Sequence, residues 1–260
     1  MDASTAIHAE AQANQVTQSE SQETKNQHTQ PMKRPEVKIS KDDDTLKCDL
    51  YGDKDVFKFK NSVAEYDFAN ENGIKVKLNP VKKYAAKIGE REVIISVRKN
   101  GTVEQINQYN EDGKLDGEQL EWHDNGHQWY IMQRKNGNLH GEQKLWYENG
   151  QQEFIHHLKN GSLHGDQCEW YPNGNQKYIM NYTDNKQDGK QLGWYENGQQ
   201  EYDYFAKNDA MEGVQVAWCS NGEKKHLYNY KHGKLHGIQE EWNDKGESVS
   251  RQSYKNGNLV

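Results

Sequence analysis

Histidine residues are the first candidates for chemistry in this sequence, because several of them together could bind a metal ion. His140, His164 and His236 recur at one position of a 24-residue repeat, but Asp116, Asp188 and Glu212 replace histidine there in the other copies. If each repeat is a β-hairpin, equivalent residues lie two strands and about 10 Å apart, which is too far for one coordination shell. We therefore expect solvated turn residues and no metal site.

Other catalytic arrangements do not occur. The chain has no Gly-x-Ser-x-Gly, His-Glu-x-x-His, P-loop or Gly-x-Gly-x-x-Gly motif, so we expect neither an enzyme nor a cofactor. Cys48, Cys168 and Cys219 are too few and too scattered for a disulfide framework.

The strongest feature is a Gly-x-Gln-x-x-Trp motif that recurs six times with a period of 24 residues, which predicts a repeat array. Its glycines are Gly117, Gly141, Gly165, Gly189, Gly213 and Gly237. Its tryptophans are Trp122, Trp146, Trp170, Trp194, Trp218 and Trp242. Glycine and tryptophan suit a hairpin and its packing, and a tryptophan platform for sugars or bases is the less favoured alternative.

The glutamine of the motif has no evident role in a hairpin. Its amide could recognise a partner, or it could bond the neighbouring strand or turn, which is the more common use of such a side chain. For recognition, we predict that one face of the array contacts a partner through glutamines and tyrosines. The candidate residues are Gln143, Tyr147, Gln167, Tyr171, Gln191 and Tyr195.

Asn-Gly pairs between alternating runs predict how each unit is built. They are typical of type I′ hairpins, as at Asn149-Gly150, and a looser turn is expected at the other junction, as at Gly137. Pairing across Asn149-Gly150 would set Trp146 opposite Glu153, with Ile155 on the same face. The prediction is all-β: an elongated single-layer β-meander of about twelve short strands, six hairpin repeats plus a partial seventh over residues 110–260.

The preceding sequence differs in composition. Residues 1–44 are polar and predict a disordered tail. Residues 45–109 predict a small β-rich capping region with strands at 56–59, 74–78 and 93–97 and turns at Asn72-Gly73 and Asn100-Gly101. Residues 81–87 could form one short helix.

Charge bears on the choice of partner. Residues 110–260 hold 16 basic and 23 acidic groups, so they carry the whole net charge of −7. An acidic array disfavours nucleic acid and anionic membranes and favours a basic partner, although the charge could serve solubility only. No run of 18 apolar residues or intact signal peptide is present, so we expect a cytoplasmic protein; the alanine-rich start leaves export after signal cleavage as the alternative.

These motifs resemble the MORN repeat class, and the closest similarity is to the bacterial variant in YwqK-like putative antitoxins. The phrases that carry the resemblance are Leu139-His140-Gly141, Trp146-Tyr147-Glu148-Asn149-Gly150-Gln151 and Leu163-His164-Gly165. The resemblance covers about residues 110–260 and implies hairpin arrays that bind proteins or, in some eukaryotic members, attach to membranes. The glutamine position often holds an aromatic or aliphatic residue in that variant.

Two functions follow as hypotheses. The first is a non-enzymatic protein-binding module, for example an antitoxin or immunity protein that occludes a basic toxin. The alternative is a structural scaffold that self-associates through its C-terminal edge strand or attaches near a membrane.

Overall fold

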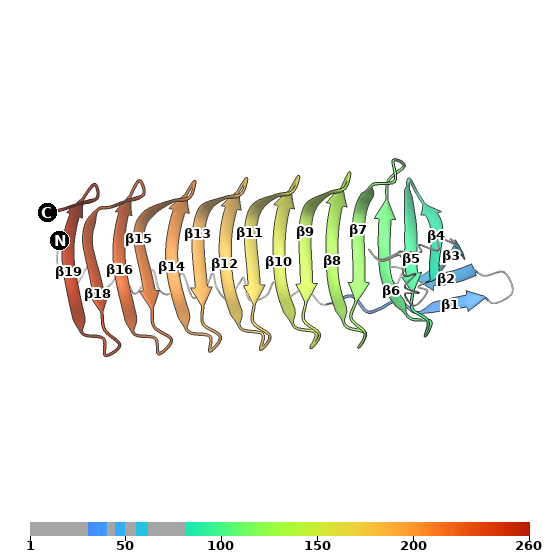
Figure 1. The fold of residues 1–260 in the computed structure, drawn as a ribbon, viewed down its shortest axis with the longest axis horizontal. Coiled ribbons are helices and arrows are strands. Elements are labelled where there is room, and N and C mark those ends of the chain that lie inside the picture. Colours follow the sequence, from blue (N-terminus) through green and yellow to red (C-terminus); the bar gives the residue numbers. More distant parts are fainter. Residues whose placement is uncertain (1–30, 41–44, 50–55, 62–81) are drawn as a thin grey trace, which may run out of the picture. The chain divides into compact units, whose positions relative to one another are not determined.

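The structure is a computed structural model that describes residues 31–40, 45–49, 56–61 and 82–260. The described part of the chain forms antiparallel strands, and nearly every strand pairs with the next along the sequence (Figure 1). Its N-terminal strands are β1 (Val37–Ser40), β2 (Thr45–Asp49), β3 (Val56–Asn61), β4 (Lys82–Ile88), β5 (Arg91–Val97) and β6 (Val103–Tyr109). The fold is therefore an all-β meander, as the sequence predicts.

The repeats contribute two strands each. The strands of the array are β7 (Leu115–Trp122), β8 (Gln128–Lys135), β9 (Asn138–Trp146), β10 (Gln152–Lys159), β11 (Ser162–Trp170), β12 (Gln176–Thr183), β13 (Lys186–Trp194), β14 (Gln200–Lys207), β15 (Ala210–Trp218), β16 (Lys224–Lys231), β17 (Lys234–Leu235), β18 (Gly237–Trp242), β19 (Ser248–Lys255) and β20 (Asn258–Leu259). Strands β17 and β18 are two parts of one unit's first strand, since both pair with β16. We number the units 1 to 6 by their tryptophans, from Trp122 to Trp242.

The tight turns lie at the junctions where the looser turns were expected. At Asn136-Gly137 both residues have positive φ, 50° and 88°, and Lys135 pairs directly with Asn138. This is the two-residue type I′ geometry, whose twist matches that of the flanking strands.

The Asn-Gly pairs close longer turns, so the type I′ prediction for them is wrong. At Asn149-Gly150 only the glycine is left-handed, with φ 84°, and its N–H donates to the Tyr147 carbonyl at 2.9 Å. The Asn149 side chain accepts a hydrogen bond from the Gln151 N–H at 3.0 Å. Asparagine thus stabilises the turn with its side chain and does not need a left-handed backbone.

A one-residue bulge shifts the register beside each tryptophan. Trp146 pairs with Gln152 and regular pairing resumes at Phe154, so Glu153 is the extra residue and the expected partner was wrong by one. Beyond the bulge, Ile155 still lies on the same side of the sheet as Trp146, as predicted.

The capping region has its own apolar core. Leu46, Tyr84, Ile95 and Ile106 are at most 2% exposed and pack in one cluster with Trp122 of the first unit. The expected helix over 81–87 is wrong, because residues 82–88 form strand β4 and pair along their whole length with β5. Sheet pairing here overrides the helical preference of the lysines and alanines.

The polar tail ends earlier than residue 44. Residues 37–40 form β1, which pairs with β2, and Met32 packs against the capping core. Strand β3 agrees with the expectation for residues 56–59, and β5 with that for 93–97. Residues 1–30 and the expected elements at 72–78 lie outside the described residues.

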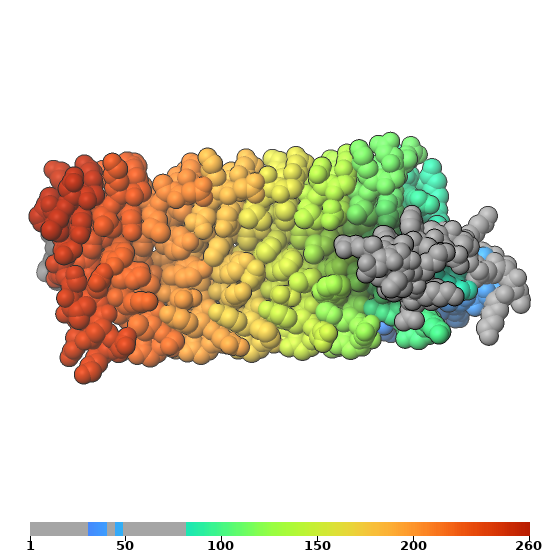
Figure 2. Space-filling model, viewed as in Figure 1, coloured from blue at the N-terminus to red at the C-terminus, as the bar shows by residue number. Residues whose placement is uncertain are grey.

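Alternation along the strands gives the array two faces, which we name by their aromatic residues. The Trp face carries the six repeated tryptophans. The Tyr face is the opposite one. We call the second strand of each unit (β8, β10, β12, β14, β16 and β19) its returning strand, and most returning strands carry a large ring on the Tyr face: Tyr130, Phe154, Tyr178, Tyr202 and His226. The units succeed one another in chain order, from green to red in Figure 2.

Candidate binding face of the array

The repeated glutamines are interior structural groups. Gln143, Gln167 and Gln191 are at most 2% exposed, so they cannot form the contact surface that we predicted for them. Gln167 shows the reason: its Nε2 donates to the His157 carbonyl at 3.0 Å, and its Oε1 accepts from the His157 N–H at 3.2 Å. His157 lies where the strand register shifts, so the amide replaces the backbone partner that this residue lacks.

A second glutamine position supports the other bulge, and sequence reasoning missed it. Gln152 donates through Nε2 to the Leu145 and Phe154 carbonyls at 2.9 and 3.0 Å. Gln128 and Gln176 make the equivalent bonds in units 1 and 3. The signal was in the sequence, since glutamine recurs there at 24-residue spacing through Gln200 before Lys224 and Ser248 replace it.

The predicted contact tyrosines join neighbouring units. The hydroxyl of Tyr147 donates to the Trp170 carbonyl at 3.0 Å, and Tyr171 and Tyr195 donate in the same way to the tryptophan carbonyl of the next unit, at 3.0 and 2.9 Å. Burial raises the pKa of all three phenols. The rings remain partly exposed, so they can border a binding surface, although their hydroxyl groups are already hydrogen-bonded within the array.

The repeated histidine and carboxylate position also links units. Asp116 accepts a hydrogen bond from the Asn136 N–H at 2.9 Å, and Glu212 accepts from the His232 N–H at 2.7 Å. His140 and His236 accept equivalent, longer bonds at 3.4 Å. These side chains cap the type I′ turn of the following unit. Within the described ranges, no three His, Cys, Asp or Glu side chains are close enough together to hold a metal ion.

The Tyr face is the best candidate for a binding surface. Its rings stand on the returning strands, and additional aromatic or thioether side chains follow two residues on: Met132, His156, Met180, Tyr204 and Tyr228. Returning strands lie two strand spacings, about 10 Å, apart. The rings therefore form ridges along the returning strands, and the strand between two neighbouring ridges forms the floor of a shallow groove.

One residue per unit occupies each floor: Glu121, Leu145, Glu169, Gly193, Ala217 and Glu241. Most floors are filled. Leu145 is a large side chain, and Glu121 and Glu241 bind Gln105 and Tyr228.

At Gly193 the neighbouring ring lies on the floor itself. A Cβ atom at Gly193 would stand 2.2 Å from Cε1 of Tyr202, although the glycine has no positive φ. The absence of a side chain at Gly193 thus makes room for the Tyr202 ring.

Glu169 is a floor residue with a charged side chain. Burial opposes its ionisation, but hydrogen bonds from His156, Tyr178 and Lys177 outweigh burial and lower the pKa of Glu169 to about 2. Burial, and after it the hydrogen bond to this carboxylate, raises the pKa of the Tyr178 phenol. The Glu169 side chain at this floor is thus already engaged by neighbouring side chains.

The floor at β15 is open. Ala217 has Tyr202 and His226 as cross-strand neighbours, and a cavity of 390 Å³ lies above it. We call this cavity the β15 slot. Its apolar and aromatic walls include Tyr202, Tyr204, Met211, Tyr228 and Tyr230.

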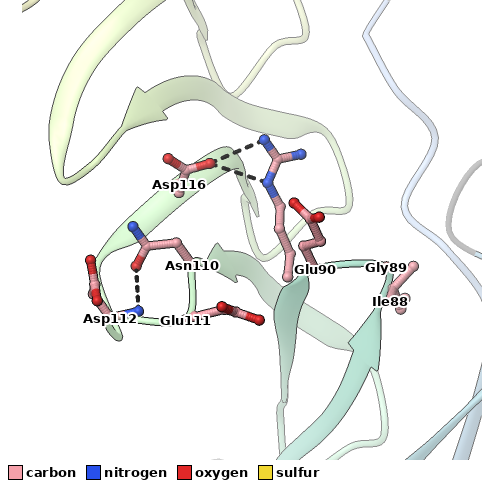
Figure 3. A pocket seen from close by; sticks show the side chains of 8 residues that line it. Ile88, Gly89, Glu90, Asn110, Glu111, Asp112 and Asp116 are labelled. Carbon is pink, nitrogen blue, oxygen red and sulfur yellow. Dashed lines mark hydrogen bonds and ion pairs between the residues drawn. The ribbon is translucent and has the colours of Figure 1, made fainter.

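A second cavity, of 580 Å³, lies between the β4–β5 and β6–β7 turns and is lined by acidic side chains (Figure 3). Its arginine is already paired, since Arg91 donates twice to Asp116 Oδ1, at 3.2 and 3.1 Å. The Asn136 N–H, and after it the bonds from Arg91, lower the pKa of Asp116. Glu111 in turn pairs with Lys87 at 3.4 Å. This arrangement stabilises the junction between cap and array and offers no catalytic pair.

The described residues include no helix with the length and hydropathy needed to span a membrane. A search of curated proteins found no match to the chain. Residues 139–160 and 163–184, which begin in β9 and β11, match the family model of the MORN repeat variant. The array thus contains MORN repeats of the variant type.

Proposed function

We propose that the array is a non-enzymatic protein-binding module whose Tyr face holds a basic partner protein. The observation that carries the proposal is the series of half-buried rings at one position of five returning strands. Aromatic side chains supply much of the binding energy of protein interfaces. A face this rich in them, and not covered by a second layer of described strands, is suited to a macromolecular partner.

Charge on the same face supports a basic partner. Burial and the neighbouring Glu169 raise the pKa of Glu153, which indicates crowded carboxylates beside Tyr147 and Lys177. A cation placed there would relieve this repulsion, and lysine or arginine would also gain from the aromatic rings. Residues 110–260 hold 23 acidic and 16 basic groups, and this excess of negative charge also attracts a basic partner at longer range.

The test is a titration of the full chain with basic, neutral and acidic extended peptides by calorimetry. We expect the basic peptide to bind, more weakly at high salt. The Glu153→Lys/Glu201→Lys variant on the Tyr face should lose about tenfold in affinity. Glu118→Lys/Glu240→Lys on the Trp face makes the same charge change and should lose much less. Equal losses in the two variants, or equal binding of the acidic peptide, would overturn the proposal.

An antitoxin or immunity role is one form of this function, in which the array covers the active surface of a basic toxin. It is supported by the sequence resemblance and by the acidic charge of the array. The check is affinity purification from the source organism, followed by an assay of whether the captured protein regains a toxic activity when the array is removed. A captured partner that is acidic, or that has the same activity when bound, argues against this form.

Self-assembly is the second candidate, and exposed apolar side chains on the Trp face favour it. Val214 and Ile238 are 54% and 43% exposed, at a position where the earlier units carry Glu142, Asp166 and other polar residues. Phe205 is 42% exposed and stands where the earlier units carry glutamine, histidine and asparagine. Light scattering over a wide concentration range tests this candidate, because a strict monomer at the highest concentration excludes it.

A further inference from the structure

The β15 slot exists because of one small residue. Of the six floor positions, only Gly193 and Ala217 carry small residues, and the ring of Tyr202 already lies over Gly193. Ala217, two strands on, is 8% exposed and does not rise between the Tyr202 and His226 rings. The slot is therefore an individual feature of the fifth unit and not a general property of the repeat.

The size of the slot suits part of a protein chain. Its volume of 390 Å³ is near the lower end of the range of ligand pockets. The walls belong to strands β14 and β16, so they are about 10 Å apart at the backbone, and their rings narrow the gap. One large side chain fits between them, whereas a folded partner element does not.

The lining selects against a charged occupant. Glu201 and Lys225 are the two formally charged residues around the slot, and their charges cancel. His226 adds no positive charge at neutral pH, because burial and then Lys225 lower its pKa. Tyr228 donates its hydroxyl to Glu241, so that carboxylate is already used. What remains is aromatic and apolar surface, which favours desolvation of an apolar group.

We infer that the β15 slot is an anchor pocket for one large apolar side chain, aromatic or leucine-like, of a partner protein. The inference rests on the proposed protein-binding function and gives it a specific point of attachment. Basic residues of the partner would lie over the acidic part of the Tyr face, and the apolar anchor would enter between Tyr202 and Tyr228. Anchors of this kind, surrounded by weaker contacts, dominate the affinity of many interfaces.

The test uses two amino-acid amides as probes of the full chain. N-acetyl-phenylalanine amide and N-acetyl-arginine amide are titrated while the ¹³C-methyl NMR signals of methionine and alanine are followed. We expect the phenylalanine probe to shift the methyl signals of Met211 and Ala217 and to saturate at about millimolar concentration, as for a small ligand. The arginine probe should leave them unchanged. If the arginine probe binds as well or better, the inference is wrong.

A matched pair of substitutions controls for the site. Ala217→Leu introduces the residue that unit 2 carries at the same position, Leu145, so the repeat already accommodates it. This variant should weaken the phenylalanine probe by about tenfold or more while circular dichroism stays the same. Leu145→Ala should open a second slot between Tyr130 and Phe154, reported by the methyl group of Met132.

The two variants keep the inference separate from the proposed function. If Ala217→Leu binds the phenylalanine probe as tightly as the unmodified chain, the slot is not an anchor pocket, whatever the basic peptides do. If Ala217→Leu does not fold, Leu145→Ala decides, because failure to create a second site also overturns the inference. If the slot binds its probe but no basic peptide binds the Tyr face, the proposed function fails and the pocket stands.

Discussion

The first three units and the last three share one motif but pack their tryptophans differently. Trp122, Trp146 and Trp170 are at most 2% exposed, whereas Trp194, Trp218 and Trp242 are only partly buried. The supporting glutamine under the tryptophan is buried in the early units and is replaced by lysine and serine in the last two. The glycine and the motif glutamine, in contrast, persist in all six units.

This difference separates two tasks within one repeat. The motif glutamine repairs the backbone at a bulge, so every unit needs it to continue the sheet. The tryptophan at the other end of the unit adds buried apolar surface, and the late units bury less of it. The late units also have the small floor residues Gly193 and Ala217, so the open surface lies in the less tightly packed half.

The largest effect is expected when a tryptophan is removed from each half. Trp146→Ala should lose about 3–5 kcal/mol of unfolding free energy, as for a fully buried aromatic side chain. Trp218→Ala should lose about half as much, because its side chain is already partly solvated. Urea denaturation of both variants measures the difference, and equal losses would show that the two halves are packed alike.

The floor at Gly193 gives a smaller effect. Gly193→Ala should cost about 2 kcal/mol, because the new methyl group meets the Tyr202 ring. The loss should shrink in the Gly193→Ala/Tyr202→Leu double variant when it is compared with Tyr202→Leu alone. Thermal unfolding of the four proteins gives this coupling. Additive losses would mean that the glycine is required for another reason.

The supporting glutamines should differ between the halves. Gln152→Ala leaves two carbonyls without their side-chain donor and should cost about 1–2 kcal/mol. Replacing Gln200, the half-buried equivalent in unit 4, by alanine should cost less than about half of that unfolding free energy. Chemical denaturation compares the two. A larger loss at Gln200 would contradict the ranking.

The smallest effect is a pH dependence that belongs to the early half. The pKa of Glu169 is about 2 in the folded chain, below its ordinary value of 4.5, so the charged form stabilises the fold. This contribution is complete above about pH 5 and is lost as the pH falls toward 2, because the unfolded chain takes up the proton first. We expect Glu169→Gln to reduce the slope of stability between pH 5 and 3, where acid titrations followed by circular dichroism measure it. An unchanged slope would show that other carboxylates cause it.

Much of the fold follows from the sequence because the repeat imposes it. Alternation and a fixed 24-residue spacing predict the strands and their order, and strand β5 is apolar enough to predict its burial. The turn types were reversed because Asn-Gly suits more than one turn when the asparagine side chain can bond the loop backbone. The helix expected over 81–87 failed because pairing with β5 is a long-range effect.

The site was less predictable. A repeated glutamine signals a shared role, but only the bulge at His157 shows that the role is to complete the backbone hydrogen bonding. The contact role of the tyrosines stays a prediction, and their hydroxyl bonds depend on the distance to the next unit, which the sequence does not give. The β15 slot depends on how one ring, Tyr202, lies over a neighbouring strand, which residue spacing alone does not encode.

The bonds between neighbouring turns have a consequence for how such arrays change in length. Asn149 donates to the Pro172 carbonyl, and Asn173 and Asn197 make the same contact with the next turn, always toward the C-terminus. These junctions are therefore built from the same contact. Gain or loss of 24 residues would lengthen or shorten the sheet by two strand spacings, about 10 Å, without creating a new kind of contact. The number of units thus sets the length of the array.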